Sequence, residues 1–211
     1  MPVLPINIAT NCLSRANAFA DQANAMQRKK EGTPQIRNDL RRMAVALGVA
    51  ALDAYMHSVV LRKINAIKKN PPKSLRRLQL DFGDLADLTN LFIERQRTNS
   101  QSRPWVHAKE ALRRRLTKET FQTYDQIASS LAMAGVQQGW SQICHHLHLT
   151  DAQVRNTLSR INHQRNKIVH EGDIVRLARP RSIKLERINP SQVRKDLRWI
   201  EALIHAIDQI V

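Results

Sequence analysis

The chain has 211 residues, of which 42% are hydrophobic, and its 34 lysine and arginine residues against 18 acidic residues give a formal net charge of +16. This composition excludes a disordered basic tail, because the apolar content suffices for one core and one or one and a half domains. The positive charge favours polyanionic partners, with nucleic acid ahead of an anionic membrane surface. Cys12 and Cys144 are too few and too far apart for a disulfide framework or a cysteine-rich zinc site, so we expect a cytoplasmic protein.

The N-terminal segment does not resemble a secretory signal. No basic residue precedes its apolar stretch, and Asn7 and Asn11 interrupt that stretch. The longest uninterrupted apolar run, residues 43–52, is far short of a bilayer span. We therefore expect a soluble protein without a membrane partner.

Helix-forming residues dominate the whole chain, glycine is scarce, and no segment of useful length alternates like a strand. A first helix is predicted over residues 9–30, ended by Gly32. The central and longest helix is predicted over residues 34–69, stopped by the two prolines that follow Asn70. Its buried face is predicted from apolar residues at steps of three to five: Ile36, Leu40, Met43, Leu47, Ala51, Tyr55, Val59 and Ile64.

Shorter helices are predicted over residues 84–95, 105–116 and 119–134. The polar segment 98–104 between the first two is expected to be a mobile loop or the lip of a site. No internal repeat or low-complexity tract is apparent.

Two helices with clear start signals complete the chain. A capping box of Thr150 and Gln153 predicts a helix that begins at Asp151, and Gly172 suits the left-handed residue after its end. The last helix is predicted to start at Asn189-Pro190, with the apolar face Val193, Leu197, Ile200, Ile204, Ile207 and Val211.

The most informative segment is residues 165–173, RNKIVHEGD, at the end of the helix that begins at Asp151. Five residues at about 100° each place Arg165 and His170 roughly 140° apart, whereas Asn166 and His170 share one face, and the long arginine can still reach the imidazole. Arginine offers a planar fork for phosphate, and an imidazole with an unperturbed pKa of about 6.5 exchanges protons at neutral pH. The combination points to chemistry on a phosphodiester. The alternative is that both are ordinary cations stabilised by the helix dipole.

Residues 165–173 resemble the signature of the HEPN superfamily, in which an arginine, a polar residue and a histidine four to six positions after the arginine mark helical ribonucleases. Residues 52–57, LDAYMH, are similar to one branch, the RiboL-PSP-HEPN family. The resemblance implies an all-α fold, a HEPN-type helical bundle with extra N-terminal and inserted helices. Residues 1–33 would form an N-terminal helix packed on the bundle and residues 34–211 the HEPN-like domain, a single domain overall.

The resemblance also implies a metal-independent endoribonuclease that acts as a homodimer, with two copies of the motif facing one cleft. Arg165 would stabilise the scissile phosphate, Asn166 would orient Arg165 or His170, and His170 would transfer protons. Attack by the ribose 2'-hydroxyl would leave 2',3'-cyclic phosphate and 5'-hydroxyl ends. No cofactor and no metal are expected. The expected partners are RNA, a second copy, and a neutralising antitoxin or another acidic protein, which would fit a toxin or defence effector.

Four further polar residues are second-tier candidates for the wall of the cleft: Asp53, His57, Glu171 and Asp173. Asp53 and His57, four residues apart in an apolar stretch, are more simply a satisfied buried pair that fixes helix packing. Glu171 and Asp173 are more simply capping or ion-pair residues, with orientation of His170 as the alternative role.

The basic residues that could contact the RNA backbone lie in several clusters. Each cluster by itself is typical of a solvated surface, but together they favour an RNA-binding surface. The candidates are Arg113, Arg114, Arg115, Lys167, Arg176, Arg179 and Arg181.

Two other patterns remain open. Residues 141–165 have the outline of a helix-turn-helix, with Gln153, Arg155 and Asn156 near the start of its second helix, so a DNA-binding regulator is the alternative function. A catalytically inactive HEPN scaffold that binds RNA or a partner is a third hypothesis. His145 and His148 could chelate a metal, but no second ligand cluster lies at a zinc spacing, and we predict no metal site.

Overall fold

A computed structural model of the chain describes residues 3–66, 73–76, 81–98, 104–175 and 183–211. Within these residues the chain is helical, apart from loops and one antiparallel bridge between Ile174 and Leu185. The all-α prediction is therefore confirmed. The helices are α1 (Pro5–Lys29), α2 (Pro34–Ala66), α3 (Lys73–Arg76), α4 (Phe82–Thr98), α5 (Pro104–Leu116), α6 (Tyr124–Ala134), α7 (Gly139–Leu147), α8 (Asp151–His170) and α9 (Pro190–Asp208).

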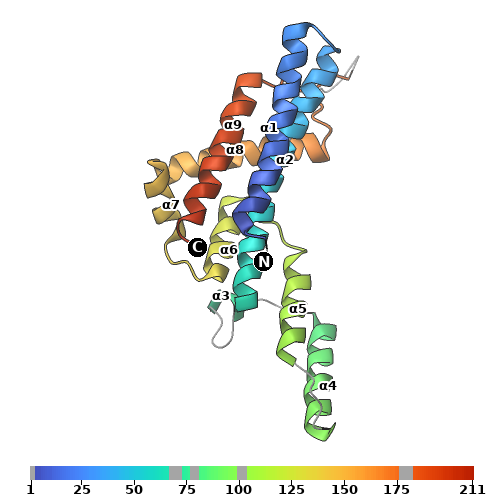
Figure 1. The fold of residues 1–211 in the computed structure, drawn as a ribbon, viewed down its shortest axis with the longest axis vertical. Coiled ribbons are helices and arrows are strands. Elements are labelled where there is room, and N and C mark those ends of the chain that lie inside the picture. The colour runs from blue at the N-terminus through green and yellow to red at the C-terminus, as the bar shows by residue number, and fades with distance from the viewer. Residues whose placement is uncertain (1–2, 67–72, 77–80, 99–103, 176–182) are drawn as a thin grey trace.

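Helices α1 and α2 form a long antiparallel pair, and α9 packs against both (Figure 1). Helix α1 begins at Pro5, four residues before the predicted start, because proline is well suited to the first helical position. Lys30, with φ of 56°, rather than Gly32, is the left-handed residue that ends α1. The predicted end of the central helix at residues 67–69 lies outside the described residues.

The predicted buried face of α2 is correct from Ala51 to Ile64 and wrong near the start of the helix. Ile36 and Met43 are each 49% exposed, whereas Arg41 and Arg42 are only 4% and 7% exposed. Steps of four residues advance about 40° beyond a full turn, so a series of such steps drifts around the helix. The series therefore begins away from the buried face, which Arg41 and Arg42 help to form, and reaches that face only near Ala51.

Helices α2 and α9 approach each other closely at Gly48. A Cβ atom at this position would lie 2.6 Å from Leu197 Cδ2, so the packing leaves room for hydrogen alone. The predicted face of α9 is buried from Val193 to Ile207, while Val211, beyond the helix, is 50% exposed. Helix α9 starts where predicted, and Asn189 caps it, because its Oδ1 accepts hydrogen bonds from the Ser191 and Gln192 amides.

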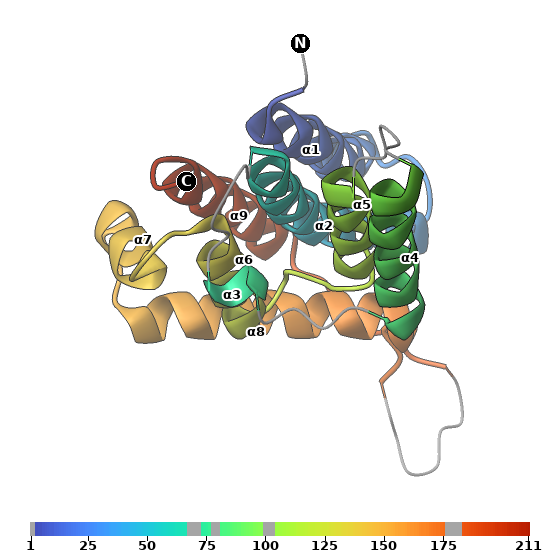
Figure 2. The same cartoon turned by 90° about the horizontal axis from the view of Figure 1, so that it is seen from below.

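Helix α8 crosses beneath α2, α6 and α9 (Figure 2). Its predicted capping box is present: the Gln153 amide donates to Thr150 Oγ1 at 3.3 Å, and the Thr150 amide donates to Gln153 Oε1 at 2.8 Å. Gly172, with φ of +61°, has the predicted left-handed conformation after the helix. Arg160 of α8 pairs with Asp196 of α9, which is 2% exposed, and this ion pair ties the two helices together.

Helix α6 is shorter than predicted. It begins at Tyr124 rather than near residue 119, because Thr123 and Gln126 form a second capping box. Residues 117–123 are therefore a connecting segment between α5 and α6. Helices α4 and α5 form a hairpin that projects from the bundle (Figure 1), and residues 99–103 of the predicted polar loop lie outside the described residues.

Helix α2 is long and apolar enough, by length and composition, to cross a membrane. The uninterrupted apolar run of residues 43–52 did not indicate this, because it covers only part of the helix. Of its most apolar window, 56% is buried inside the bundle. Leu52, Tyr55 and Met56 are among the most buried side chains of the core. These properties are those of a central core helix.

Candidate active site

The last turns of α8 bring together the three residues predicted to be catalytic. Arg165 Nη1 donates a hydrogen bond to Asn166 Oδ1 at 3.0 Å and lies 3.2 Å from His170 Nε2. Since a guanidinium nitrogen can only donate, a hydrogen bond at this contact requires His170 Nε2 as the acceptor, with the ring proton on Nδ1. The structure thus places a cation and a proton acceptor side by side.

These groups are accessible from solvent. Asn166 and His170 are exposed and Arg165 is half-buried, so a phosphate of a large substrate can approach them. Helix geometry alone separates Arg165 from His170 by about 140°, and the extended arginine side chain overcomes that separation. The contact is local to α8.

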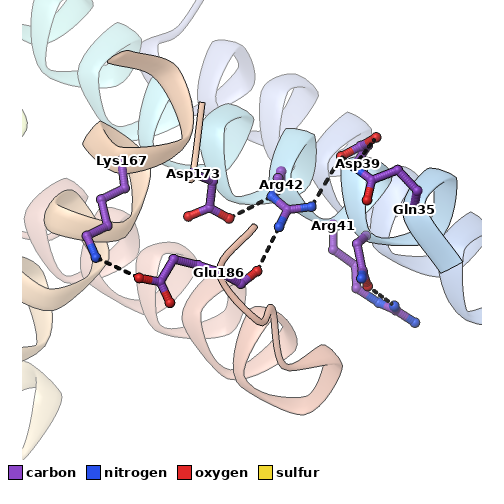
Figure 3. A network of polar contacts seen from close by, with 8 residues as sticks. Gln35, Asp39, Arg41, Arg42, Lys167, Asp173 and Glu186 are labelled. Carbon is purple, nitrogen blue, oxygen red and sulfur yellow. Dashed lines mark hydrogen bonds and ion pairs between the residues drawn. The ribbon is translucent and has the colours of Figure 1, made fainter. Parts of the chain in front are cut away.

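A buried ion pair anchors the segment that follows His170 to helix α2 (Figure 3). Arg42 Nε donates to Asp173 Oδ2 at 2.6 Å, and the side chains of the pair are 8% and 6% exposed. Arg42 Nη2 also donates to the backbone carbonyl of Glu186 at 2.8 Å, and the Glu186 amide donates to the Asp173 carbonyl at 2.8 Å. Arg42 Nη1 lies 3.2 Å from Asp39 Oδ1. The guanidinium therefore holds both sides of the hairpin that links α8 to α9.

This network assigns structural contacts to two predicted site residues. Asp173 is the buried partner of Arg42, in agreement with its simpler interpretation as an ion-pair residue. Lys167, predicted to contact RNA, lies with its Nζ 3.2 Å from Glu186 Oε1 (Figure 3). Glu171 is the C-cap residue of α8 and is exposed. The hairpin contacts were not predictable from the motif.

Asp53 and His57 hold the segment between α5 and α6 against helix α2. Asp53 Oδ1 accepts a hydrogen bond from the Phe121 amide at 2.5 Å, and His57 Nε2 lies 3.1 Å from the Glu119 carbonyl. The His57 and Phe121 rings are 4.6 Å apart. The two residues thus fix a connecting segment, and through it they support the start of α6.

A groove of about 420 Å³ lies between the start of α6 and helix α8. Pockets that hold small ligands commonly measure about 300–1,000 Å³, so its size suits part of a nucleotide chain. Asn166, one of the residues predicted to be catalytic, is part of its lining. The groove was not predictable from the sequence, because its walls come from two helices. Its lining residues are Thr123, Tyr124, Asp125, Arg155, Ser159, Asn162, His163 and Asn166.

Asn162 is the most buried of the groove residues on α8, at 7% exposure. Its Nδ2 donates to the Gln122 carbonyl, but its Oδ1 is buried and has no hydrogen-bond partner among the described residues. A buried acceptor without a donor costs about 1–3 kcal/mol. The groove therefore contains an unsatisfied acceptor.

Three planar side chains are stacked at the other end of the groove. The Trp140 and Tyr124 rings are parallel within 10°, with centroids 4.2 Å apart, and Arg155 Cζ lies 3.8 Å from the Tyr124 centroid. Two groups this close to one centroid must lie on opposite faces of the Tyr124 ring. The Trp140 indole donates to the Tyr124 carbonyl at 3.2 Å, and the Tyr124 hydroxyl donates to Asp151 Oδ1. The order is therefore Trp140, Tyr124, Arg155.

The two tyrosines of the chain are expected to ionise above their ordinary pKa of 10. Burial and the hydrogen bond to Asp151 raise the pKa of Tyr124 to about 12, and burial and Asp208 raise the pKa of Tyr55 further. Because the folded state retains these protons, the stability that Tyr124 contributes is present below pH 10 and is lost as pH rises from 10 towards 12. Tyrosinate absorbance of the folded protein should stay low at pH 10 and appear at pH 10 after unfolding in urea. Half-ionisation of both tyrosines at pH 10 in the folded protein would contradict this prediction.

The predicted RNA-binding arginines of α5 are engaged with their own chain. Arg113 lies 3.1 Å from Glu110, Arg114 lies 2.5 Å from Asp84, and Arg115 pairs with Glu119. These partners compensate part of the positive charge of α5. The other three predicted arginines, Arg176, Arg179 and Arg181, lie outside the described residues.

Among the described residues, no group of three histidine, cysteine, aspartate or glutamate side chains is arranged to hold a metal ion. The rings of His145 and His148 at the end of α7 are 6.5 Å apart, and that of His146 is 6.0 Å from His145.

The comparison with protein families agrees with the helical bundle. The family model described as RiboL-PSP-HEPN matches residues 10–211, which include most of α1 and all later helices. No curated protein and no solved structure gives a significant match. The chain belongs to the RiboL-PSP-HEPN family, a family of helical HEPN-type domains.

Proposed function

We propose that this protein is a metal-independent endoribonuclease. Membership of a HEPN-type family supports a ribonuclease in general terms. The observation that carries the specific proposal is the arrangement of Arg165, whose Nη1 lies 3.0 Å from Asn166 Oδ1 and 3.2 Å from His170 Nε2. A neutral imidazole can accept a proton once its Nε2 exchanges the Arg165 N–H for the ribose hydroxyl, and the guanidinium is then free to stabilise a phosphorane.

The proposed reaction uses the RNA itself as nucleophile. The ribose 2'-hydroxyl loses its proton to an imidazole, the 2'-oxygen bonds to phosphorus, and the bond from phosphorus to the 5'-oxygen breaks. The leaving 5'-oxygen takes up a proton, so the ends are a 2',3'-cyclic phosphate and a 5'-hydroxyl. Arg165 would compensate the charge on the non-bridging oxygens, and Asn166 would hold the guanidinium. An internal nucleophile needs neither an activated serine nor a metal-bound water.

We also propose that two copies share one cleft. One site offers a single His170, whereas the reaction removes one proton and delivers another, so two imidazoles from a two-fold pair would supply a base and an acid together. The exposure of His170 supports this arrangement, because a partner can reach it. Light scattering should give twice the 24.2 kDa mass of one chain at micromolar concentration.

The cleavage assay compares labelled RNA with DNA of the same sequence in the presence of EDTA. Because DNA lacks the 2'-hydroxyl, we expect cleavage of the RNA alone. Cleavage of both polymers, or loss of RNA cleavage on adding EDTA, would contradict the proposal.

The helix-turn-helix alternative has less support from the geometry of α7 and α8. The Gln153 side chain, a potential base reader, is used in the capping box, and Arg155 lies over Tyr124. Asp125 and Asp151, each 3.9 Å from Arg155, add negative charge where a DNA phosphate would approach. Sequence-specific binding of duplex DNA that depends on Arg155 more than on His170 would favour this alternative, and RNA binding without cleavage would favour an inactive scaffold.

A toxin or defence effector in the cytoplasm is the biological role we propose for such an enzyme. The net charge of +16 supports RNA as the partner and would also attract an acidic neutralising protein. Expression in cells should then lower total RNA integrity, and His170→Ala should prevent that loss.

A further inference from the structure

One stripe of helix α8 connects the stacked side chains to the catalytic motif. Arg155, Ser159, Asn162, His163 and Asn166 line the groove, and their spacings of four, seven, eight and eleven residues place them on one face of the helix. Fifteen residues at about 1.5 Å each put His170 roughly 22 Å from Arg155 along the same helix. The stripe is long enough for a few nucleotides of an extended chain.

The stacked side chains present a flat surface at the far end of this stripe. Trp140 and Arg155 cover the two faces of Tyr124, so the side of the Arg155 guanidinium away from Tyr124 is the one left for a ligand. The Arg155 side chain is 50% exposed. Its charge is already compensated by Asp125 and Asp151 at 3.9 Å, which favours a neutral planar group over a phosphate. Nucleobases stack on guanidinium planes in this way when they are not paired in a helix.

The unsatisfied acceptor of Asn162 lies between the stack and the motif. Its Oδ1 has no donor among the described residues, although the residue lines the groove and is 7% exposed. The amino groups of adenine, cytosine and guanine are donors of the required kind. Because this oxygen is itself buried, a base amino group can reach it only if the Asn162 side chain turns toward the groove.

We propose that the α8 stripe from Arg155 to Asn166 is a binding track for unpaired RNA, in which a nucleobase stacks on Arg155 a few nucleotides from the phosphate held by Arg165 and His170. The track extends the proposed nuclease function. It rests on that proposal because the phosphate at Arg165 and His170 sets the direction in which the RNA runs along α8. It assigns the substrate class as single-stranded segments of RNA. Paired bases cannot use the track, because their faces are covered by neighbouring bases.

The test measures binding without cleavage, using fluorescence anisotropy of a labelled 2'-O-methyl oligoadenylate, whose sugars lack the attacking hydroxyl. Arg155→Ala should weaken binding roughly 5- to 150-fold, the range found for losing one stacked base. Arg155→Lys should weaken it nearly as much, because lysine keeps the charge but lacks the plane. Arg194→Ala is the matched control, since it removes a similarly exposed arginine from α9, 43% against 50%.

An abasic oligonucleotide of the same length separates stacking from charge. We expect Arg155→Ala to change its binding less than twofold, and a duplex to bind independently of Arg155. Two results would overturn the track. One is that Arg155→Lys binds oligoadenylate as tightly as the wild-type protein. The other is that Arg155→Ala weakens binding of the abasic chain as much as binding of oligoadenylate.

Cleavage of unmodified RNA by the same proteins keeps the two proposals apart. If the wild-type protein cleaves RNA but the Arg155 variants bind RNA as tightly as the wild type, the track is overturned and the nuclease proposal stands. Binding with the expected Arg155 dependence but without cleavage by the wild-type protein supports the track and overturns the nuclease proposal.

Discussion

Replacing His170 with alanine is expected to lower the rate of RNA cleavage by about 10²- to 10⁴-fold, the usual contribution of a positioned acid or base. The expected loss is in the rate, because the imidazole exchanges protons in the reaction whereas groove and backbone contacts hold the RNA. Cleavage of a fluorescent RNA under single-turnover conditions measures this rate, and anisotropy with a non-cleavable oligonucleotide checks that binding is retained.

The matched control is His205→Ala, which removes an exposed histidine from helix α9 and should leave the rate within twofold of wild type. Arg165→Lys adds a second comparison. Lysine keeps the charge but cannot donate through a planar fork, so we expect a marked loss of rate with the fold intact. A His170→Ala protein that cleaves at the wild-type rate would show that another site, or another protein in the preparation, performs the reaction.

Replacing Arg42 with alanine is expected to destabilise the protein by about 3–5 kcal/mol, because it leaves the Asp173 carboxylate buried without its partner. In a chain of this size, each kcal/mol lowers Tm by roughly 2–4 °C. Urea unfolding followed by circular dichroism measures the free energy of unfolding. The pairing of residues 173–175 with residues 184–186 should loosen as well, so cleavage should also fall through poorer positioning of His170.

Two variants control this prediction. Arg194→Ala breaks the exposed pair with Asp21 and should cost at most about 1 kcal/mol. The double replacement Arg42→Met with Asp173→Asn removes both charges and should recover part of the lost stability, because neither buried charge is left alone and asparagine tolerates the left-handed backbone at position 173. A loss below about 1 kcal/mol in Arg42→Ala would mean that the buried pair does not anchor the hairpin.

The features that sequence predicted well are local ones. The contacts of Arg165 with Asn166 and His170 span at most five residues of one helix, so helix geometry and side-chain length were sufficient to predict them. The same holds for the capping box of Thr150 and for the cap of α9 at Asn189, where the interacting atoms are two or three residues apart. Fold class followed from composition and from the family resemblance.

The features that sequence missed depend on contacts between distant segments. Arg42 and Asp173 are 131 residues apart, and no local pattern indicates that an arginine near the start of α2 is buried. The groove needs Tyr124 from α6 and Arg155 from α8, and its stack adds Trp140 from α7. One signal was available: polar residues at spacings of four, seven and eleven from Arg155 form a helix stripe that is not needed for the core.

The measurement that tests the central claim most directly is the chemical identity of the RNA ends. Mass spectrometry of fragments produced in EDTA should show 2',3'-cyclic phosphates and 5'-hydroxyls with the wild-type protein, and no such fragments above background with Arg165→Ala or His170→Ala. Fragments that end in 3'-hydroxyls and 5'-phosphates, or cyclic ends made equally by all three proteins, would contradict the assignment of Arg165, Asn166 and His170 as the cleavage site.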